Sequence, residues 1–431
     1  MKSRTFASLS VYNYRVYFAG ALVSNIGTWM GRTAQDWLVL TQLTDHDSTA
    51  LGIVTALQFA PVVVLAPFAG AITDRFPKRR VLFCTQTALA VTSALLAALV
   101  LGGVVQLWHV YALALLQGVA TALDNPGRQA FVSEMVEPGL LSNAVGLNAT
   151  SFNAARLIGP GIAGLCIGLI GTGNTLIFNT LSFVAVLIAL RAMRPKELMP
   201  APQVRGKGKV REGLAYVRHR PDIMLILFMI FMLGTFGMNF QITIALMATT
   251  IFHKGAAEYG LLGSIMAIGS LAGALMAARR ERPRLRIVVI ALSGFTVSSA
   301  IAAMAPSYLL FALFLIPTGL CAITTMNTAN ATVQLSVTPV MRGRVMALYM
   351  AIFMGGTPVG APLIGWIGSA FGARWTILVG SVATAVTVVA TMIYLMRRDD
   401  LRLRLEGRPI PHVEIRPRDR AGEDLAGERV A

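Results

Sequence analysis

Long runs of apolar residues alternate with short polar connections along most of the chain. Most of these runs are long enough to cross about 30 Å of hydrocarbon as helices. We count twelve, at residues 16–40, 50–72, 81–103, 108–126, 142–170, 174–192, 223–251, 259–278, 287–304, 308–332, 345–370 and 375–396. A longer basic stretch divides them into six and six. The pattern therefore predicts an all-α membrane protein whose twelve transmembrane helices form two pseudo-symmetric six-helix bundles.

Positively charged residues fall almost entirely at the two ends of the chain and in the connections after even-numbered runs, as Lys78 and Arg128 do. Lys254 and Arg374 are the only ones in the connections after odd-numbered runs. Because Lys and Arg resist transfer across a membrane, we expect both termini and every even-numbered connection to be cytoplasmic. The lipid bilayer is thus a predicted partner.

The composition agrees with this reading, since 55% of the residues are hydrophobic, 13% are charged and the mean hydropathy is +0.66. The net charge of +17 is the excess that short cytoplasmic loops require, so we expect no nucleic-acid partner. The three cysteines and five histidines show no metal-ligand spacing, and no phosphate-binding Gly-rich loop is present. We therefore expect no metal, no cofactor and no direct drive by ATP.

The charge and proline content divides the chain into four predicted parts. They are an N-terminal six-helix bundle at 1–192, a cytoplasmic central loop at 193–222, a C-terminal six-helix bundle at 223–396 and a cytoplasmic disordered tail at 397–431. Val210, Leu214 and Val217 recur at helical spacing in the central loop. They indicate either a short amphipathic helix on the inner leaflet or a solvated basic linker.

Ionisable side chains inside hydrocarbon cost several kcal/mol, so each one is a candidate functional group. Four lie within the apolar runs and are proton-coupling candidates: Arg32, Asp36, Asp124 and Arg156. Arg32 and Asp36 are four residues apart and are expected to pair, either as a structural ion pair or with Asp36 as the proton carrier. Asp124 is the rival carrier, or it forms a gate with Arg128. We expect Arg156 to meet Asp36, Asp124 or an anionic group on the cargo.

Polar residues form stripes at helical spacing in the first, fourth, seventh and tenth runs. A stripe of this kind faces a partner helix or an aqueous cavity in preference to lipid. The residues that we predict to line a substrate cavity are Asn25, Trp29, Gln117, Thr121, Asn239, Asn327, Asn330 and Gln334.

Residues 70–80, with the sequence GAITDRFPKRR, resemble the signature of the loop after the second helix in the major facilitator superfamily. The resemblance implies the major facilitator fold, in which two bundles rock about a central site. It also implies that residues of this loop make cytoplasmic contacts that break and re-form during the cycle. The predicted conformational gating residues are Gly70, Asp74, Arg75, Arg79 and Arg128.

The segment Gly159-Pro160-Gly161-Ile162-Ala163-Gly164 is similar to the Gly-Pro signature of proton-driven exporters in that superfamily. Proline removes a backbone donor, and small residues let helices approach closely. We therefore predict a helix pivot at Gly159, Pro160 and Gly164, with ordinary small-residue packing as the alternative.

Two further segments, Asn25–Met30 and Asp124–Gln129, resemble the bacterial drug and enterobactin exporter branch of the superfamily. The resemblance implies a secondary active transporter, not an enzyme, of the bacterial cell membrane. Its expected activity is proton-coupled efflux of a small hydrophobic or amphipathic compound by alternating access, with the small-molecule substrate and protons as partners. We expect a monomer. An importer or uniporter on the same fold and a non-transporting sensor or scaffold remain the alternatives.

Overall fold

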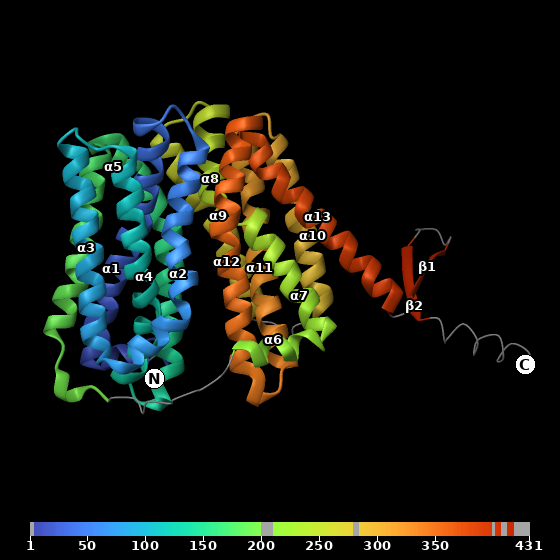
Figure 1. Ribbon diagram of the computed structural model, residues 1–431, viewed down its shortest axis with the longest axis horizontal. Coiled ribbons are helices and arrows are strands. Elements are labelled where there is room, and N and C mark those ends of the chain that lie inside the picture. The colour runs from blue at the N-terminus through green and yellow to red at the C-terminus, as the bar shows by residue number, and fades with distance from the viewer. Residues whose placement is uncertain (1–3, 200–209, 279–283, 399–400, 407–411, 418–431) are drawn as a thin grey trace, which may run out of the picture.

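The structure is a computed structural model that describes residues 4–199, 210–278, 284–398, 401–406 and 412–417. Long helices run side by side and fall into two groups, α1 to α5 and α7 to α13 (Figure 1). The first group comprises η1 (Arg4–Ser10), α1 (Tyr12–Trp37) with its continuation η2 (Leu38–Leu43), α2 (Ser48–Arg75), α3 (Lys78–Leu101), α4 (Leu107–Met135) and α5 (Pro138–Ala192).

The helix α5 contains two membrane crossings, because the chain turns back at Gly171. The backbone of Gly171 has a φ of 85°, a left-handed conformation that glycine adopts at little cost. Gly159 before the turn and Asn179 after it both lie against α1. The turn falls between the predicted runs 142–170 and 174–192, so these two crossings are confirmed.

The second group follows η3 (Pro195–Glu197) and the short helix α6 (Val210–Arg218). Its first crossing is interrupted near Asn239 and consists of α7 (Pro221–Met232), η4 (Leu233–Gly237), α8 (Phe240–Leu246) and η5 (Met247–Ile251). The others are α9 (Ala256–Ala278), α10 (Leu285–Met304), α11 (Tyr308–Ser336), α12 (Pro339–Phe371) and α13 (Ala373–Arg398).

Nine helical stretches in the described residues are long and apolar enough to cross a membrane. The stretch in α5 supplies two crossings, and the charge-bearing helices α1 and α4 complete the set of twelve. The predicted number of transmembrane helices is therefore confirmed.

The two groups share a hydrophobic core at one end of the molecule only. Leu40 and Leu51 from the first group pack in one cluster with Leu246, Phe311 and Ile364 from the second. Toward the other end each group has a core of its own, around Phe131 and Leu190 in the first and around Phe295 and Val333 in the second. The two groups are thus held together at one end and packed separately at the other.

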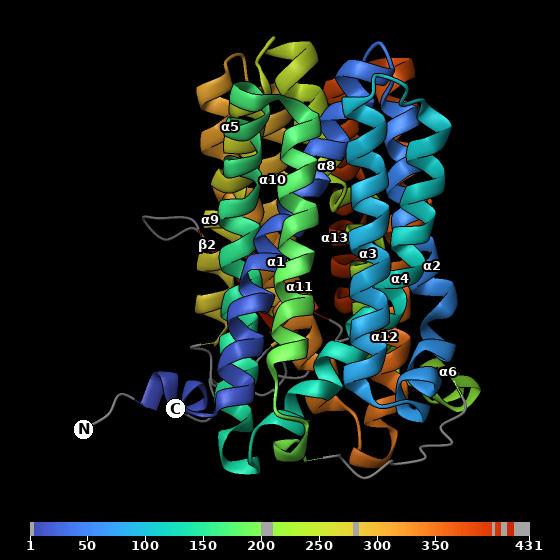
Figure 2. The same ribbon diagram turned by 90° about the vertical axis from the view of Figure 1, so that its left-hand side faces the viewer.

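The end with separate cores is also the end where the positive charges gather, and we call it the basic end. The start of α1 and the helix α6 lie there (Figures 1 and 2). Arg79 donates from Nε to the Leu190 carbonyl at the end of α5, 2.8 Å away, and Arg344 forms a 2.7 Å ion pair with Glu212 of α6. The helix α6 confirms the helical reading of residues 210–218, and its Val217 is buried against the protein.

The tail differs from the predicted disorder in one part. β1 (Leu401–Glu406) and β2 (His412–Pro417) pair as antiparallel strands, with Leu401 opposite Pro417 and Glu406 opposite His412. In β1, leucine alternates with arginine, and this period of two favours a strand. Residues 399–400, 407–411 and 418–431 lie outside the described part of the chain.

Candidate functional site

Two pockets meet at Trp29 and Arg32 of α1. The polar pocket, of about 170 Å³, lies within the first group of helices, and the interface pocket, of about 140 Å³, lies between the groups. The α1 stripe predicted from the sequence borders both, with Asn25 on the polar pocket and Asp36 on the interface pocket. The predicted face of α1 thus points to internal space.

Helices of both groups build the interface pocket. Asp36 and Arg156 line it from the first group, and Phe240 and Tyr259 line it from the second. The full lining consists of Trp29, Arg32, Thr33, Asp36, Phe59, Arg156, Pro160, Phe240, Gln241, Ile244, Tyr259, Gly263, Met266 and Ala267. Any movement of one group against the other therefore changes this pocket.

Asp36 lies at the contact between the two groups. Its side chain is buried, and the Tyr259 hydroxyl donates to its Oδ2 across 3.4 Å. The neighbouring Trp37 ring stacks on the Tyr259 ring, with 6.1 Å between centroids. Within the described ranges of the chain, Asp36 is the only acidic residue that lines the interface pocket.

The predicted ion pair between Arg32 and Asp36 is not formed. The Arg32 guanidinium lies over the rings of Trp29 and Phe59 instead, 5.4 and 5.5 Å from their centroids. Among the described residues, no carboxylate lies within 4 Å of Arg32 or Arg156, so the expected contacts of Arg156 with Asp36 or Asp124 are also wrong. The spacing on α1 allowed the pair, but two aromatic faces attract the guanidinium elsewhere.

Arg156 lies over the same indole ring of Trp29, 5.8 Å from its centroid. A cation over an aromatic ring gains about 2 kcal/mol when both are desolvated. A charged side chain at the centre of a bilayer costs from about 2.5 to more than 10 kcal/mol. The ring contacts therefore offset only part of the cost of burying this charge.

Asp124 has its hydrogen-bonding capacity filled by neighbours. Arg128 Nε lies 2.5 Å from its Oδ2, and Thr85 Oγ1 and Gln86 Nε2 donate to its Oδ1 at 2.7 and 2.8 Å. The predicted Asp124–Arg128 pair is confirmed. Three donors tie this carboxylate to side chains of α3 and α4, and this favours a structural or gating role over proton carriage.

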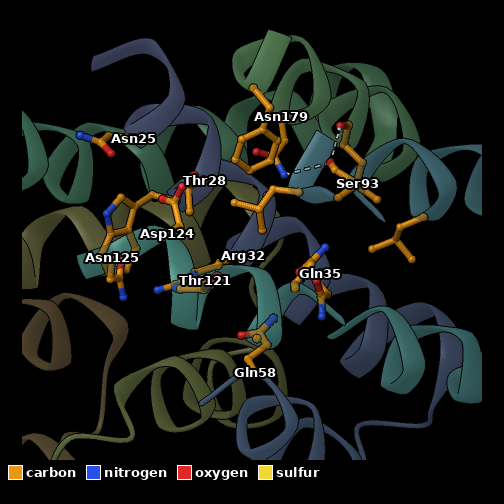
Figure 3. A pocket seen from close by; sticks show the side chains of 18 of the residues that line it. Asn25, Thr28, Arg32, Gln35, Gln58, Ser93, Thr121, Asp124, Asn125 and Asn179 are labelled. Carbon is orange, nitrogen blue, oxygen red and sulfur yellow. Dashed lines mark hydrogen bonds between the residues drawn. The ribbon is translucent and has the colours of Figure 1, made fainter. Parts of the chain in front are cut away.

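The polar pocket collects the predicted residues of α1 and α4 (Figure 3). Gln117 and Thr121 line it, and Asn25 Nδ2 donates to Ser151 Oγ over 3.2 Å. Gln35, Gln58, Ser93 and Asn179 also line this pocket and were not found from the sequence. Ser93 and Asn179 are joined by a 3.1 Å hydrogen bond, which Figure 3 shows. Ser93 and Asn179 each lie beside a threonine in a mainly apolar run, so no periodic stripe marked them.

The polar residues predicted on the second group do not line either pocket. Asn239 is buried, and its Nδ2 donates to the Thr235 carbonyl over 2.7 Å where the crossing is interrupted. Asn327 and Gln334 of α11 are exposed, and Asn330 is half-buried. Their substrate contacts stay a prediction.

The Gly-Pro segment of α5 lies between helices of the two groups. Ser264 of α9 accepts a hydrogen bond from the Gly161 amide at 3.1 Å. A Cβ added at Gly164 would lie 3.0 Å from Cα of Ala257 at the start of α9, and one added at Gly159 would meet Trp29 of α1. The predicted pivot residues thus allow close packing on both sides of α5.

The gating residues predicted after α2 have contacts within the first group. Arg79 binds the end of α5 as described above, Arg75 is exposed, and a Cβ added at Gly70 would meet nothing within 4 Å. The Asp74 side chain lies outside the described part of the structure. The gating role of these residues stays a prediction.

A hydrogen-bonded cluster joins the two groups at the end opposite the basic end. Ser48 Oγ donates to the Gly365 carbonyl over 2.7 Å, and the side-chain oxygens of Thr49 and Ser369 are 2.9 Å apart. Ser369 also donates to Asp47 Oδ1 at 2.9 Å. Burial alone would raise the pKa of Asp47, but the hydrogen bonds from Ser369 and Thr49 outweigh it and hold that pKa below its ordinary value. Sequence reasoning missed this cluster, although Asp47 before an apolar run is a helix-capping signal.

Twelve helices in two groups around a pocket between them define a membrane transporter fold. The family described as transmembrane secretion effectors matches residues 3–420. The chain is 23% identical over 396 residues to the staphyloferrin A transporter of Staphylococcus aureus, covering 91% of this chain and 98% of that protein. It is 26% identical over 401 residues to the multidrug efflux pump Tap of Mycolicibacterium fortuitum, covering 88% and 95%.

Among solved structures, the chain resembles a bacterial homologue of the human lysosomal transporter Spinster in an inward-facing, occupied conformation. The TM-score is 0.74 at 12% identity, and the match covers 90% of this chain and 97% of that one. The chain belongs to the transmembrane secretion effector family of the major facilitator superfamily. It has the major facilitator fold and is a multi-pass membrane transporter and not an enzyme, as the sequence predicted.

Proposed function

We propose that this protein exports a small amphipathic compound across a bacterial cell membrane and that Asp36 couples the export to protons. One observation carries the proposal. The interface pocket is built by both groups of helices, and among the residues that the structure describes, Asp36 is the only acidic one that lines it. A proton carrier has to lie where alternating access changes its exposure, and the contact between the groups is such a place.

The proposed export direction draws on charge, packing and the named relatives together. Lys and Arg favour the cytoplasmic side, so we assign the basic end to the cytoplasm. The shared core then closes the outer side, and the groups are packed separately on the cytoplasmic side. This arrangement fits an inward-facing state that loads cargo from the cytoplasm. The relatives named as a siderophore transporter and a multidrug efflux pump support export of a small molecule.

The lining of the interface pocket supports an amphipathic cargo. Phe59, Phe240 and Met266 offer apolar surface, and Trp29 offers an aromatic face. Thioether and aromatic groups adapt to ligands of varied shape. Asp36 and the two arginines supply the polar contacts that orient a ligand.

The test uses inside-out vesicles from cells that express the full chain. A panel of siderophores, antibiotics and aromatic acids is offered outside the vesicles, with the lumen either acidified or at the external pH. We expect accumulation of at least one compound class that requires the acidic lumen. Accumulation that is unaffected by collapse of the pH gradient would remove the proton-coupling part. Uptake only into right-side-out vesicles would replace export by import.

A further inference from the structure

We propose that the interface pocket takes an anionic cargo, in which a carboxylate or similar acid group is joined to an aromatic or other planar ring. Arg32 and Arg156 would bind the acid group. The inference rests on the proposed function for the identity of the pocket as the cargo site, and it adds the chemical class of the cargo.

The first support is the charge balance of the pocket. Two guanidinium groups, those of Arg32 and Arg156, line it together with one carboxylate, that of Asp36. With Asp36 ionised, these three residues leave one positive charge unbalanced. Asp124 does not supply a compensating negative charge, because it forms its ion pair with Arg128. A monoanionic ligand would bring the charges in the pocket to zero.

The second support is that the donors of both arginines are unused. Within the described part of the chain, neither guanidinium donates a hydrogen bond or forms an ion pair. Their contacts are with ring faces, Trp29 for both and Phe59 for Arg32. These contacts place each guanidinium beside an aromatic ring but use none of its N–H donors. A guanidinium presents them as a fork that matches a carboxylate.

The third support is the position of the two arginines around one ring. Both guanidinium groups contact the indole of Trp29, and both residues line the interface pocket, so a ligand in that pocket lies near both. Phe152 makes an edge contact with that indole at 5.9 Å. An acid group bound there would place an attached ring toward the apolar residues of α8 and α9, among them Phe240 and Met266. A cationic cargo would instead add a third positive charge to the wall.

The binding test uses three probes with the same ring and different charge: 2-naphthoate, 2-naphthamide and protonated 2-naphthylmethylamine. Binding to the purified full chain in nanodiscs is measured by titration calorimetry. We expect 2-naphthoate to bind at least about tenfold more tightly than the amide, because charge-assisted hydrogen bonds are gained. The ammonium probe should bind more weakly than the amide. Equal binding of the acid and the amide would overturn the inference.

Variants assign the preference to the two arginines. Arg32→Gln and Arg156→Gln should each weaken binding of 2-naphthoate far more than binding of the amide, and so remove most of the preference for the acid. Arg32→Lys and Arg156→Lys keep the charge and should retain part of it, which separates a lost anion site from a misfolded protein. Arg286→Gln removes an exposed charge from the start of α10 and should have no effect. An unchanged preference in both Gln variants would also refute the assignment.

Transport separates this inference from the proposed function. If 2-naphthoate binds through the two arginines but no anion is moved in proteoliposomes, the anion site stands and the exporter proposal fails. If neutral or cationic compounds are exported and the acid does not bind, the exporter proposal stands and the anion site fails.

Discussion

The Tyr259 hydroxyl of α9 lies 3.4 Å from Oδ2 of Asp36 in α1, and the bond joins the two groups of helices at the edge of the interface pocket. The ionised carboxylate accepts this hydrogen bond more strongly than the protonated form would. Protonation of Asp36 therefore weakens a contact between the groups. Under the proposed function, this contact would link the state of the Asp36 proton to the relative position of the two groups.

Asp36→Asn should abolish concentrative export and leave cargo exchange in place. The amide cannot bind and release a proton, but it keeps the size and polarity of the carboxyl group. The measurement compares pH-driven uptake with counterflow in the same proteoliposomes. Asp45→Asn, which changes an exposed aspartate outside both pockets, serves as the control. Concentrative uptake by Asp36→Asn would exclude Asp36 as the proton carrier.

Tyr259→Phe should let the two groups of helices separate more often at the end opposite the basic end, while transport persists. A hydrogen bond of 3.4 Å is long, so its loss should cost about 1 kcal/mol, or about a fivefold change in the equilibrium between states. A single cysteine at position 369, labelled with a membrane-impermeant maleimide, reports the opening. Tyr111→Phe is the matched control, because within the described residues no hydrogen bond is recorded for the Tyr111 hydroxyl. Equal labelling in both variants would show that the bond does not hold the groups together.

Sequence periodicity was enough to predict which helices form and which face of α1 is polar. The turn at Gly171 and the contact of Asp124 with Arg128 follow from residues close in the chain, and such contacts depend on helix geometry alone. Tyr259 of α9 and Phe59 of α2 also line the interface pocket. Nothing in the sequence around either residue marks it as a pocket residue. Their positions depend on how the helices pack.

The failure of the Arg32–Asp36 prediction has the same origin. Spacing of four residues permits the pair, but Trp29 and Phe59 compete for the guanidinium. Phe59 is a residue of α2, so this competition is not visible from α1 alone. The functional roles of Asn327, Asn330 and Gln334 were predicted from the stripe on α11 alone, and these residues line neither the polar pocket nor the interface pocket.

Cross-linking Thr49→Cys to Ser369→Cys should stop transport. The two native side-chain oxygens are 2.9 Å apart and belong to different groups, so sulfur atoms placed there lie within reach of a disulfide or a short cross-linker. The background carries serine in place of Cys84, Cys166 and Cys321, which are free thiols. Transport should return on reduction. Each single cysteine variant should remain active under the same oxidation, and transport through the cross-linked protein would show that this end does not open.

The hydrogen-bonded cluster of Asp47, Ser48, Thr49 and Ser369 should hold the two groups together equally well at every pH in the physiological range. Its hydrogen bonds lower the pKa of Asp47 from an ordinary value of 3.8, so the closed state prefers the ionised form. This contribution is present above the ordinary pKa and is lost as the pH falls below it. Maleimide labelling at position 48, divided at each pH by labelling of the same cysteine in the unfolded chain because only the thiolate reacts, should therefore be constant above about pH 5. Asp47→Asn should raise labelling by the same factor throughout the range above about pH 5, and a rise in the protein that keeps Asp47 between neutral and mildly acidic pH would contradict the assignment.

Gly164→Ala should disturb the contact between α5 and α9, whereas Gly168→Ala on the same helix should not. A Cβ at Gly164 would lie 3.0 Å from Cα of Ala257 and would press on the Ala256 carbonyl, so the two helices must separate. A Cβ at Gly168 would meet nothing within 4 Å. Because both substitutions add one methyl group to one helix, they have the same intrinsic effect on helix stability. Any difference in thermal stability or in maleimide labelling at position 369 therefore reports the contact between the groups. We expect lower stability and more labelling for Gly164→Ala, and equal behaviour of the two variants would show that close packing at Gly164 is not required for closure.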